Sequence, residues 1–145
     1  MNYSKKIILI IFVSLTCSFV VAQSKKDSIA IKNTVKDFIE GWYEGDAKRM
    51  ENSLHPDVVS KIVIRSDKGI RLGRFTAEKL VTLTRQGGGT DVPKEEQRKN
   101  IKILEIYQNM ASARVLAYDA MEFLHLAKWE GEWKIMNILF ERSKK

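Results

Sequence analysis

The sequence predicts an α+β fold in which three helices cover one face of a curved sheet, either mixed or antiparallel. Apolar residues recur at helical intervals after residue 27. Runs rich in branched and aromatic residues dominate the chain after residue 100. The expected order is helix, helix, hairpin, helix and then a series of strands. Helices segregated from strands in this way are typical of α+β domains with one helical layer.

The first predicted helix begins near Ser24, whose spacing from Asp27 is that of a capping box. Gly45 ends this helix, and Asp46 is suited to cap a short second helix over residues 47–53. The apolar residues of the first helix form a single stripe, which indicates an amphipathic helix packed on a core: Ile31, Val35, Phe38, Ile39 and Trp42.

Pro56 ends the second helix, because a residue that precedes proline avoids the helical region. Residues 58–65 and 70–74 are predicted strands joined by a turn. Thr76 is the expected N-cap of a third helix over residues 77–86.

Three consecutive glycines, residues 87–89, end the third helix and predict a flexible loop. A phosphate-binding loop would lie between a strand and a helix and would carry a Lys-Ser or Lys-Thr pair, which this segment lacks. Gly131 favours a tight turn in the last hairpin, because glycine tolerates positive φ. The strands expected after the loop are residues 101–107, 111–123, 123–129 and 133–140.

Side chains alternate between the two faces of a strand, so the last strand can be assigned face by face. One face is expected to carry Trp133, Ile135, Asn137 and Leu139. The other is expected to carry Lys134, Met136, Ile138 and Phe140. Neither set is polar throughout, so both faces are expected to be partly covered.

Residues 1–22 have the pattern of an export signal, with two lysines before an apolar core over residues 7–21 and small residues before Gln23. We therefore expect residues 1–22 to be a signal peptide, residues 23–145 to be the domain, and the protein to be periplasmic or extracellular. The alternatives are a retained membrane anchor and a lipoprotein acylated at Cys17. After cleavage no stable membrane span is expected.

Composition narrows the classes of partner. The only cysteine lies in the predicted signal, so the exported domain must be stable without disulfides. The formal net charge is +7, but the charges are mixed along the chain, and the absence of a basic stripe argues against nucleic-acid binding. The two histidines are far apart in the sequence, so no metal site and no cofactor are predicted.

The end of the chain resembles a known family. Residues 122–140 follow the pattern acidic-aromatic-Leu-x-Leu-x-Lys-x-x-Gly-x-Trp-Lys-Ile-x-Asn-x-x-Phe, which is similar to the end of the putative lumazine-binding family of the nuclear transport factor 2-like (SnoaL-like) superfamily. Residues 38–46, 54–57 and 111–115 resemble further segments of that family. The resemblance implies a cone-shaped domain whose helices and concave sheet enclose a pocket.

Seven residues are expected to contact a ligand in that pocket: Trp42, Tyr43, His55, Tyr118, Glu122, Trp133 and Asn137. Glu122 lies between two apolar neighbours, so its pKa should shift if its face of the strand is buried. The competing interpretation for His55 is a backbone hydrogen bond at the end of a helix. For the two tyrosines it is a core position with a hydrated hydroxyl.

The leading hypothesis is an exported domain that binds a small apolar or aromatic molecule in its cone, or associates with itself, without catalysis. The first alternative is a lyase or isomerase that uses His55 or His125 as base with Glu122 as its partner. Ketosteroid isomerases, which are similar in fold, carry a carboxylate shortly after the position of Asp57, and residues 60–62 contain none. The second alternative is a homodimer formed through an outer sheet face that carries Met136, Ile138 and Phe140.

Overall fold

The computed structural model describes residues 25–143, so the predicted signal peptide and the capping residue Ser24 lie outside the described residues. Within the described part, the first helix covers residues 25–44 and stops at Gly45, whose φ is +68°. The other helices are α2 (Ala47–Ser53), α3 (Ala77–Arg85) and a short 3₁₀ turn, η1 (Lys94–Glu96).

The two predicted caps that fall within the described residues are present. The Asp46 carboxylate accepts hydrogen bonds from the backbone N–H groups of Lys48 and Arg49, and the Thr76 hydroxyl accepts one from the N–H of Lys79. The caps satisfy donors that a helix leaves unpaired in its first turn, so they fix where α2 and α3 begin.

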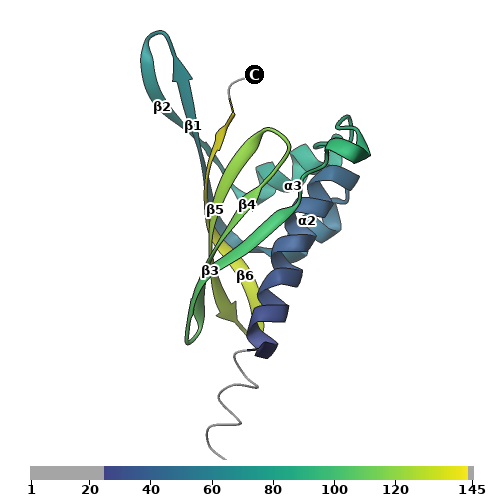
Figure 1. Cartoon of the computed structure of the whole chain (residues 1–145), viewed down its shortest axis with the longest axis vertical. Helices are drawn as coiled ribbons and strands as arrows, with labels where there is room; N and C mark the ends of the chain where they lie inside the picture. The colour runs from purple at the N-terminus through teal and green to yellow at the C-terminus, as the bar shows by residue number, and fades with distance from the viewer. Residues whose placement is uncertain (1–24, 144–145) are drawn as a thin grey trace, which may run out of the picture.

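Six strands form one mixed sheet in the order β2-β1-β6-β5-β4-β3. Only the contact between β1 and β6 is parallel, and the other four neighbouring pairs are antiparallel. The helices lie along one face of the sheet, and the β1–β2 hairpin projects beyond them (Figure 1). The strands are β1 (Leu54–Ser66), β2 (Gly69–Phe75), β3 (Asn100–Tyr107), β4 (Met110–Leu116), β5 (Ala120–Trp129) and β6 (Glu132–Arg142).

The prediction of one continuous strand over residues 111–123 was wrong. The chain leaves the ladder after Leu116 and returns at Ala120, with the N–H of Ala117 bonded to the carbonyl of Ala120 across a tight connection. The N–H of Tyr118 is bonded instead to the hydroxyl of Tyr43 from the first helix. A contact between distant segments therefore interrupts residues 111–123, whose apolar composition is typical of a single strand.

The predicted faces of the last strand hold only for its first half. Leu126 pairs with Ile135 and His125 pairs with Asn137, so Met136 is one extra residue in β6, a β-bulge. An extra residue reverses the alternation beyond it. Ile138 is consequently 1% exposed, whereas Leu139 is 43% exposed.

The core fills the space between the helices and the sheet. Branched residues of the first helix meet side chains from β5 and β6, and each such side chain contributes about 1.5–3 kcal/mol when fully buried. The least exposed are Ile31, Val35, Ile39, Leu124, Ile135 and Ile138. No helix within residues 25–143 is both long enough and apolar enough to cross a bilayer.

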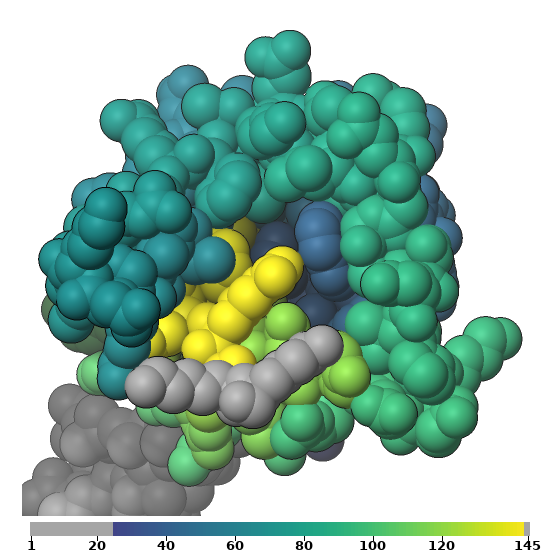
Figure 2. All heavy atoms as spheres, turned by 90° about the horizontal axis from the view of Figure 1, so that it is seen from above, coloured from purple at the N-terminus to yellow at the C-terminus, as the bar shows by residue number. Residues whose placement is uncertain are grey.

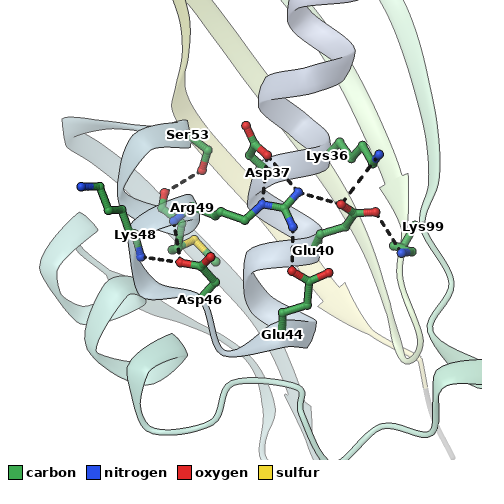
Figure 3. A network of polar contacts seen from close by, with 10 residues as sticks. Lys36, Asp37, Glu40, Glu44, Asp46, Lys48, Arg49, Ser53 and Lys99 are labelled. Atoms are coloured by element: carbon green, nitrogen blue, oxygen red, sulfur yellow. Dashed lines mark hydrogen bonds and ion pairs between the residues drawn. The ribbon is translucent and has the colours of Figure 1, made fainter.

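An arginine fastens α2 to the first helix (Figure 3). Arg49 lies 2.9 Å from Asp37, 2.7 Å from Glu40 and 2.7 Å from Glu44, all in the first helix. Burial opposes ionisation of Glu40, but hydrogen bonds from Arg49 and Lys99 hold its pKa below the usual value. This network holds α2 against the first helix.

Candidate functional site

A hollow opens between the helices and the inner face of the sheet, near the projecting hairpin. Viewed from above, atoms of the first helix are visible at the bottom of an opening surrounded by β6, the hairpin and the segment after α3 (Figure 2). Its volume is about 140 Å³. Its walls are mostly apolar, and the lining includes Trp42, Tyr43, Ser60, Tyr118, Asp119, Glu122, Phe140 and Arg142.

The glycines after α3 build the wall on the side of Trp42. The N–H of Gly89 donates to the carbonyl of Trp42 at 2.9 Å, and a Cβ on Gly89 would lie 2.7 Å from the indole Nε1. Gly88 has a φ of +53°, and a Cβ there would lie 2.5 Å from the same carbonyl. The glycines therefore allow the segment to pack directly on the tryptophan, which the sequence alone did not indicate.

Tyr43 fixes the rim of the hollow. Its buried hydroxyl donates to the carbonyl of Arg98 at 3.0 Å and accepts from the N–H of Tyr118 at 2.9 Å. Burial raises the pKa of this hydroxyl above its ordinary value. Both hydrogen bonds go to backbone groups, so this tyrosine positions the β4–β5 connection more than it offers a group to a ligand.

Glu122 is the most unusual group in the hollow. It pairs in register with Phe140 on the inner face of the sheet and is only partly exposed. Among residues 25–143, no side chain or backbone group forms a hydrogen bond or ion pair with its carboxylate. Burial, with a further contribution from the negative charge of Asp119, raises its pKa to about 7. The group can therefore be a hydrogen-bond donor or a carboxylate near neutral pH.

Ser60 supplies a second unsatisfied group, although nothing in the sequence alone indicates that it is a site residue. It is 1% exposed and lines the hollow. Its hydroxyl is buried and has no hydrogen-bond partner within the described part of the chain. A buried hydroxyl without a partner costs about 1–3 kcal/mol, so it calls for an explanation such as a bound group.

At the mouth of the hollow, Arg142 approaches Asp119, with 3.6 Å between its Nε and the carboxylate. The Asp119 side chain is partly exposed and the Arg142 side chain is mostly exposed, so the pair is weak. Among the described residues, Glu122 is then the charged side chain of the hollow that has no partner.

Trp133 does not line the hollow. It is buried between the first helix and the β5–β6 hairpin, and its Nε1 donates a hydrogen bond to Asp27 at 3.1 Å. Asp27 also accepts a hydrogen bond from Lys128 at 3.0 Å. Asp27 belongs to the first helix, so the contact pins that helix to the β5–β6 hairpin. The placement of Trp133 among ligand contacts is corrected accordingly, because its indole N–H is used inside the protein.

Asn137 does not line the hollow either, because the bulge at Met136 turns it to the outer face. Its side-chain amide donates to the carbonyl of Val59 at 3.0 Å. The sequence could not reveal this displacement, since both halves of the strand alternate plausibly.

The two histidines lie away from Glu122. His55 packs edge-on against Trp129 with 5.0 Å between ring centroids, and its Nδ1 accepts from the N–H of Asp57 at 3.1 Å. Trp129 lies seven residues along β5 from Glu122, so His55 and Glu122 are about 20 Å apart. His125 is exposed on the opposite face of β5, three residues from Glu122. Within residues 25–143 no three His, Asp or Glu side chains gather in a metal-ligating cluster.

Comparisons with known proteins agree with this architecture. The model of the putative lumazine-binding family matches residues 26–141. A nuclear transport factor 2-like protein of unknown function from Shewanella baltica is 17% identical, with a TM-score of 0.65 over 83% of this chain and 96% of that chain. A nuclear transport factor 2-like protein with a cystatin-like fold from Novosphingobium aromaticivorans is 11% identical, with a TM-score of 0.65 over 88% and 89%.

A hexachlorocyclohexane dehydrochlorinase is also similar, at 11% identity and a TM-score of 0.54 over 81% of this chain and 85% of that chain. A search of curated proteins found no match. At these identities the solved structures establish a shared fold and leave the chemistry to be argued from the site.

Proposed function

Because the chain belongs to the putative lumazine-binding family of the nuclear transport factor 2-like superfamily, we propose that it binds a small, largely apolar or aromatic molecule in a cone-shaped hollow, without catalysis. The observation that carries the proposal is a pair of polar groups that line one apolar hollow and have no partner within residues 25–143, the partly exposed Glu122 carboxylate and the buried Ser60 hydroxyl. Ligand sites commonly combine apolar walls with a few convergent polar groups.

The register of the sheet supports one ligand touching both groups. Glu122 is level with Ile62 through Phe140, and Ser60 is two residues from Ile62 on the same inner face. The two polar groups are therefore separated by about two strand spacings across the sheet and two residues along it, or about 12 Å between Cα atoms. Trp42 and Tyr118 would form the side walls of this site.

The geometry favours binding over the lyase or isomerase alternative. That alternative needs a histidine within hydrogen-bond reach of Glu122 or of a shared substrate atom. One histidine lies about 20 Å away along the sheet and the other lies on the opposite face. We therefore assign Glu122 to recognition of the ligand.

We also propose that the protein is exported and that it can associate with itself. The signal-like pattern of residues 1–22 supports export to the periplasm or beyond. Self-association through the outer sheet face would use Phe123 and Leu139, which are exposed there. Of the residues first assigned to such a contact, Ile138 is buried and Phe140 packs against the core, as the bulge requires. A mass measurement in solution tests the dimer.

The binding proposal is tested with a matched pair of variants. Ile62 lines the hollow and its neighbour Val63 faces the other side of the same strand. Ile62→Phe fills the hollow, whereas Val63→Phe adds the same bulk outside it. A library of small aromatic and apolar compounds should raise the melting temperature of the wild type and of Val63→Phe, and should do so much less for Ile62→Phe. If no compound stabilises the wild type, or if the two variants respond alike, the proposal is wrong.

A further inference from the structure

The walls of the hollow are unusually rich in aromatic rings. Six of the residues that line it are aromatic and come from the first helix, β2, the β4–β5 connection and β6: Phe38, Trp42, Tyr43, Phe75, Tyr118 and Phe140. Phe75 and Phe140 lie 6.2 Å apart between ring centroids. Aromatic faces carry partial negative charge, and rings that surround a site attract cations as well as apolar groups.

The charges in the hollow are also biased. The titratable or charged side chains that line it are Tyr43 from the first helix, Tyr118 and Asp119 from the β4–β5 connection, Glu122 from β5 and Arg142 from β6. The residues contributed by α3, β1 and β2 are uncharged. Arg142 lies against Asp119 at the mouth. When Glu122 is ionised, the interior therefore holds one negative charge with no cation from the described residues beside it.

From this combination we propose that the ligand of the hollow is a small organic cation, an ammonium ion that carries methyl or methylene groups. This inference rests on the proposed binding function and narrows its ligand from an apolar or aromatic molecule to a cation whose substituents are apolar. The ammonium would pair with the Glu122 carboxylate, and its alkyl groups would lie against the rings of Trp42 and Phe140. An ionised carboxylate in apolar surroundings is unfavourable unless it is paired, so the ligand would supply the missing partner.

The remaining unsatisfied group restricts the ligand further. The Ser60 hydroxyl faces the same space and can donate to or accept from a hydroxyl or carbonyl. A ligand with an ammonium at one end and such a group a few atoms away would satisfy both residues. The volume of about 140 Å³ suits a head group of this size and excludes a large ring system from the closed part of the hollow.

The ionisation of Glu122 gives the inference a signature that apolar binding lacks. Burial raises the pKa of Glu122 to about 7, so the carboxylate form is the minor form at pH 6 and the major form at pH 8. A quaternary ammonium ion does not titrate, so its affinity should fall about tenfold from pH 8 to pH 6 as the carboxylate is protonated. An uncharged ligand of the same shape should show no such loss.

Calorimetric titration of the full chain with choline, tetramethylammonium and the uncharged carbon isostere of choline tests the inference. We expect both cations to bind at pH 8, to bind about tenfold more weakly at pH 6, and to outcompete the isostere. Glu122→Gln should abolish the pH dependence and weaken the cations to the level of the isostere. Glu105→Gln removes an exposed carboxylate from the outer face of the same sheet and should change neither.

Each other result overturns the inference. If the isostere binds as tightly as choline, the hollow takes neutral molecules, and the binding function stands without the cation. If Glu122→Gln leaves cation binding intact, the charge is not the recognition element. If neither cation binds, the ligand class is wrong, and the comparison of Ile62→Phe with Val63→Phe then decides independently whether the hollow binds anything.

Discussion

Replacing Glu122 by glutamine should make the protein more stable at alkaline pH. Glutamine keeps the shape and the polarity of the protonated acid but cannot ionise in the hollow. The folded state holds the proton on Glu122 up to about pH 7, whereas an ordinary glutamate loses it near 4.5. Between those two values the folded state binds more protons than the unfolded state, so wild-type stability should fall as pH rises.

The size of the effect follows from the two pKa values. The destabilisation by Glu122 should be less than about 1 kcal/mol at pH 5 and should reach about 3 kcal/mol at pH 8, where both states are ionised. The difference between Glu122→Gln and the wild type should grow over the same interval and then level off. A penalty of this size at a group without a partner is expected where a protein exchanges stability for binding.

Urea unfolding of both proteins at pH 5, 6, 7 and 8 measures the difference directly, provided that the slopes with denaturant agree. Glu105→Gln, which is exposed on the outer face, should show no pH-dependent difference. The reasoning is refuted if Glu122→Gln is equally stable relative to the wild type at every pH, or if the wild type gains on it as pH rises.

Three further substitutions test how the hollow is built. Arg49→Met should lower the free energy of unfolding by about 2 kcal/mol, because it leaves three carboxylates of the first helix without their shared cation; urea unfolding at low and high salt measures it, and an unchanged midpoint contradicts it. Tyr43→Phe should lower the free energy of unfolding by about 1–3 kcal/mol and speed amide exchange at Tyr118, whose N–H loses its acceptor. Unchanged amide protection at Tyr118 would show that Tyr43 does not position the β4–β5 connection. Gly89→Ala should lower the melting temperature and shift the fluorescence of Trp42, since the added methyl would lie 2.7 Å from the indole nitrogen; identical spectra would show that the loop packs differently.

Much of the architecture could be predicted because its signals are local. Gly45 and Asp46 mark the end of one helix and the start of the next within the printed sequence, and the structure places both boundaries there. The strand break near Tyr118 could not be predicted, since it depends on the hydroxyl of Tyr43, 75 residues earlier. Local patterns determine where elements begin, whereas contacts between distant segments determine where a long apolar run is interrupted.

The site was predicted less completely, for a related reason. Glu122 stood out because a carboxylate lay between apolar neighbours, and its raised pKa agrees with that reasoning. Ser60 gave no signal, because a serine in a strand is ordinary until its possible partners have been examined in three dimensions. Trp133 was misplaced because the sequence does not show that Asp27 accepts its indole N–H. The three glycines after α3 predicted a flexible loop, but the sequence does not show that two of them allow the backbone to pack against Trp42.

Because Met136 is an extra residue, the side chains of β6 alternate in one phase before it and in the opposite phase after it. The change of phase lies just before the part of the strand that faces the hollow. If Met136 instead took a regular place in the ladder, every chemical group of the site would remain in the chain, yet Ile138 and Phe140 would turn toward water and an amide and a leucine would turn inward. Spacing in this strand therefore specifies the ligand-facing wall as strongly as composition does. When residues are matched between related chains, a single misplaced gap at this position would exchange the inner wall for the outer one.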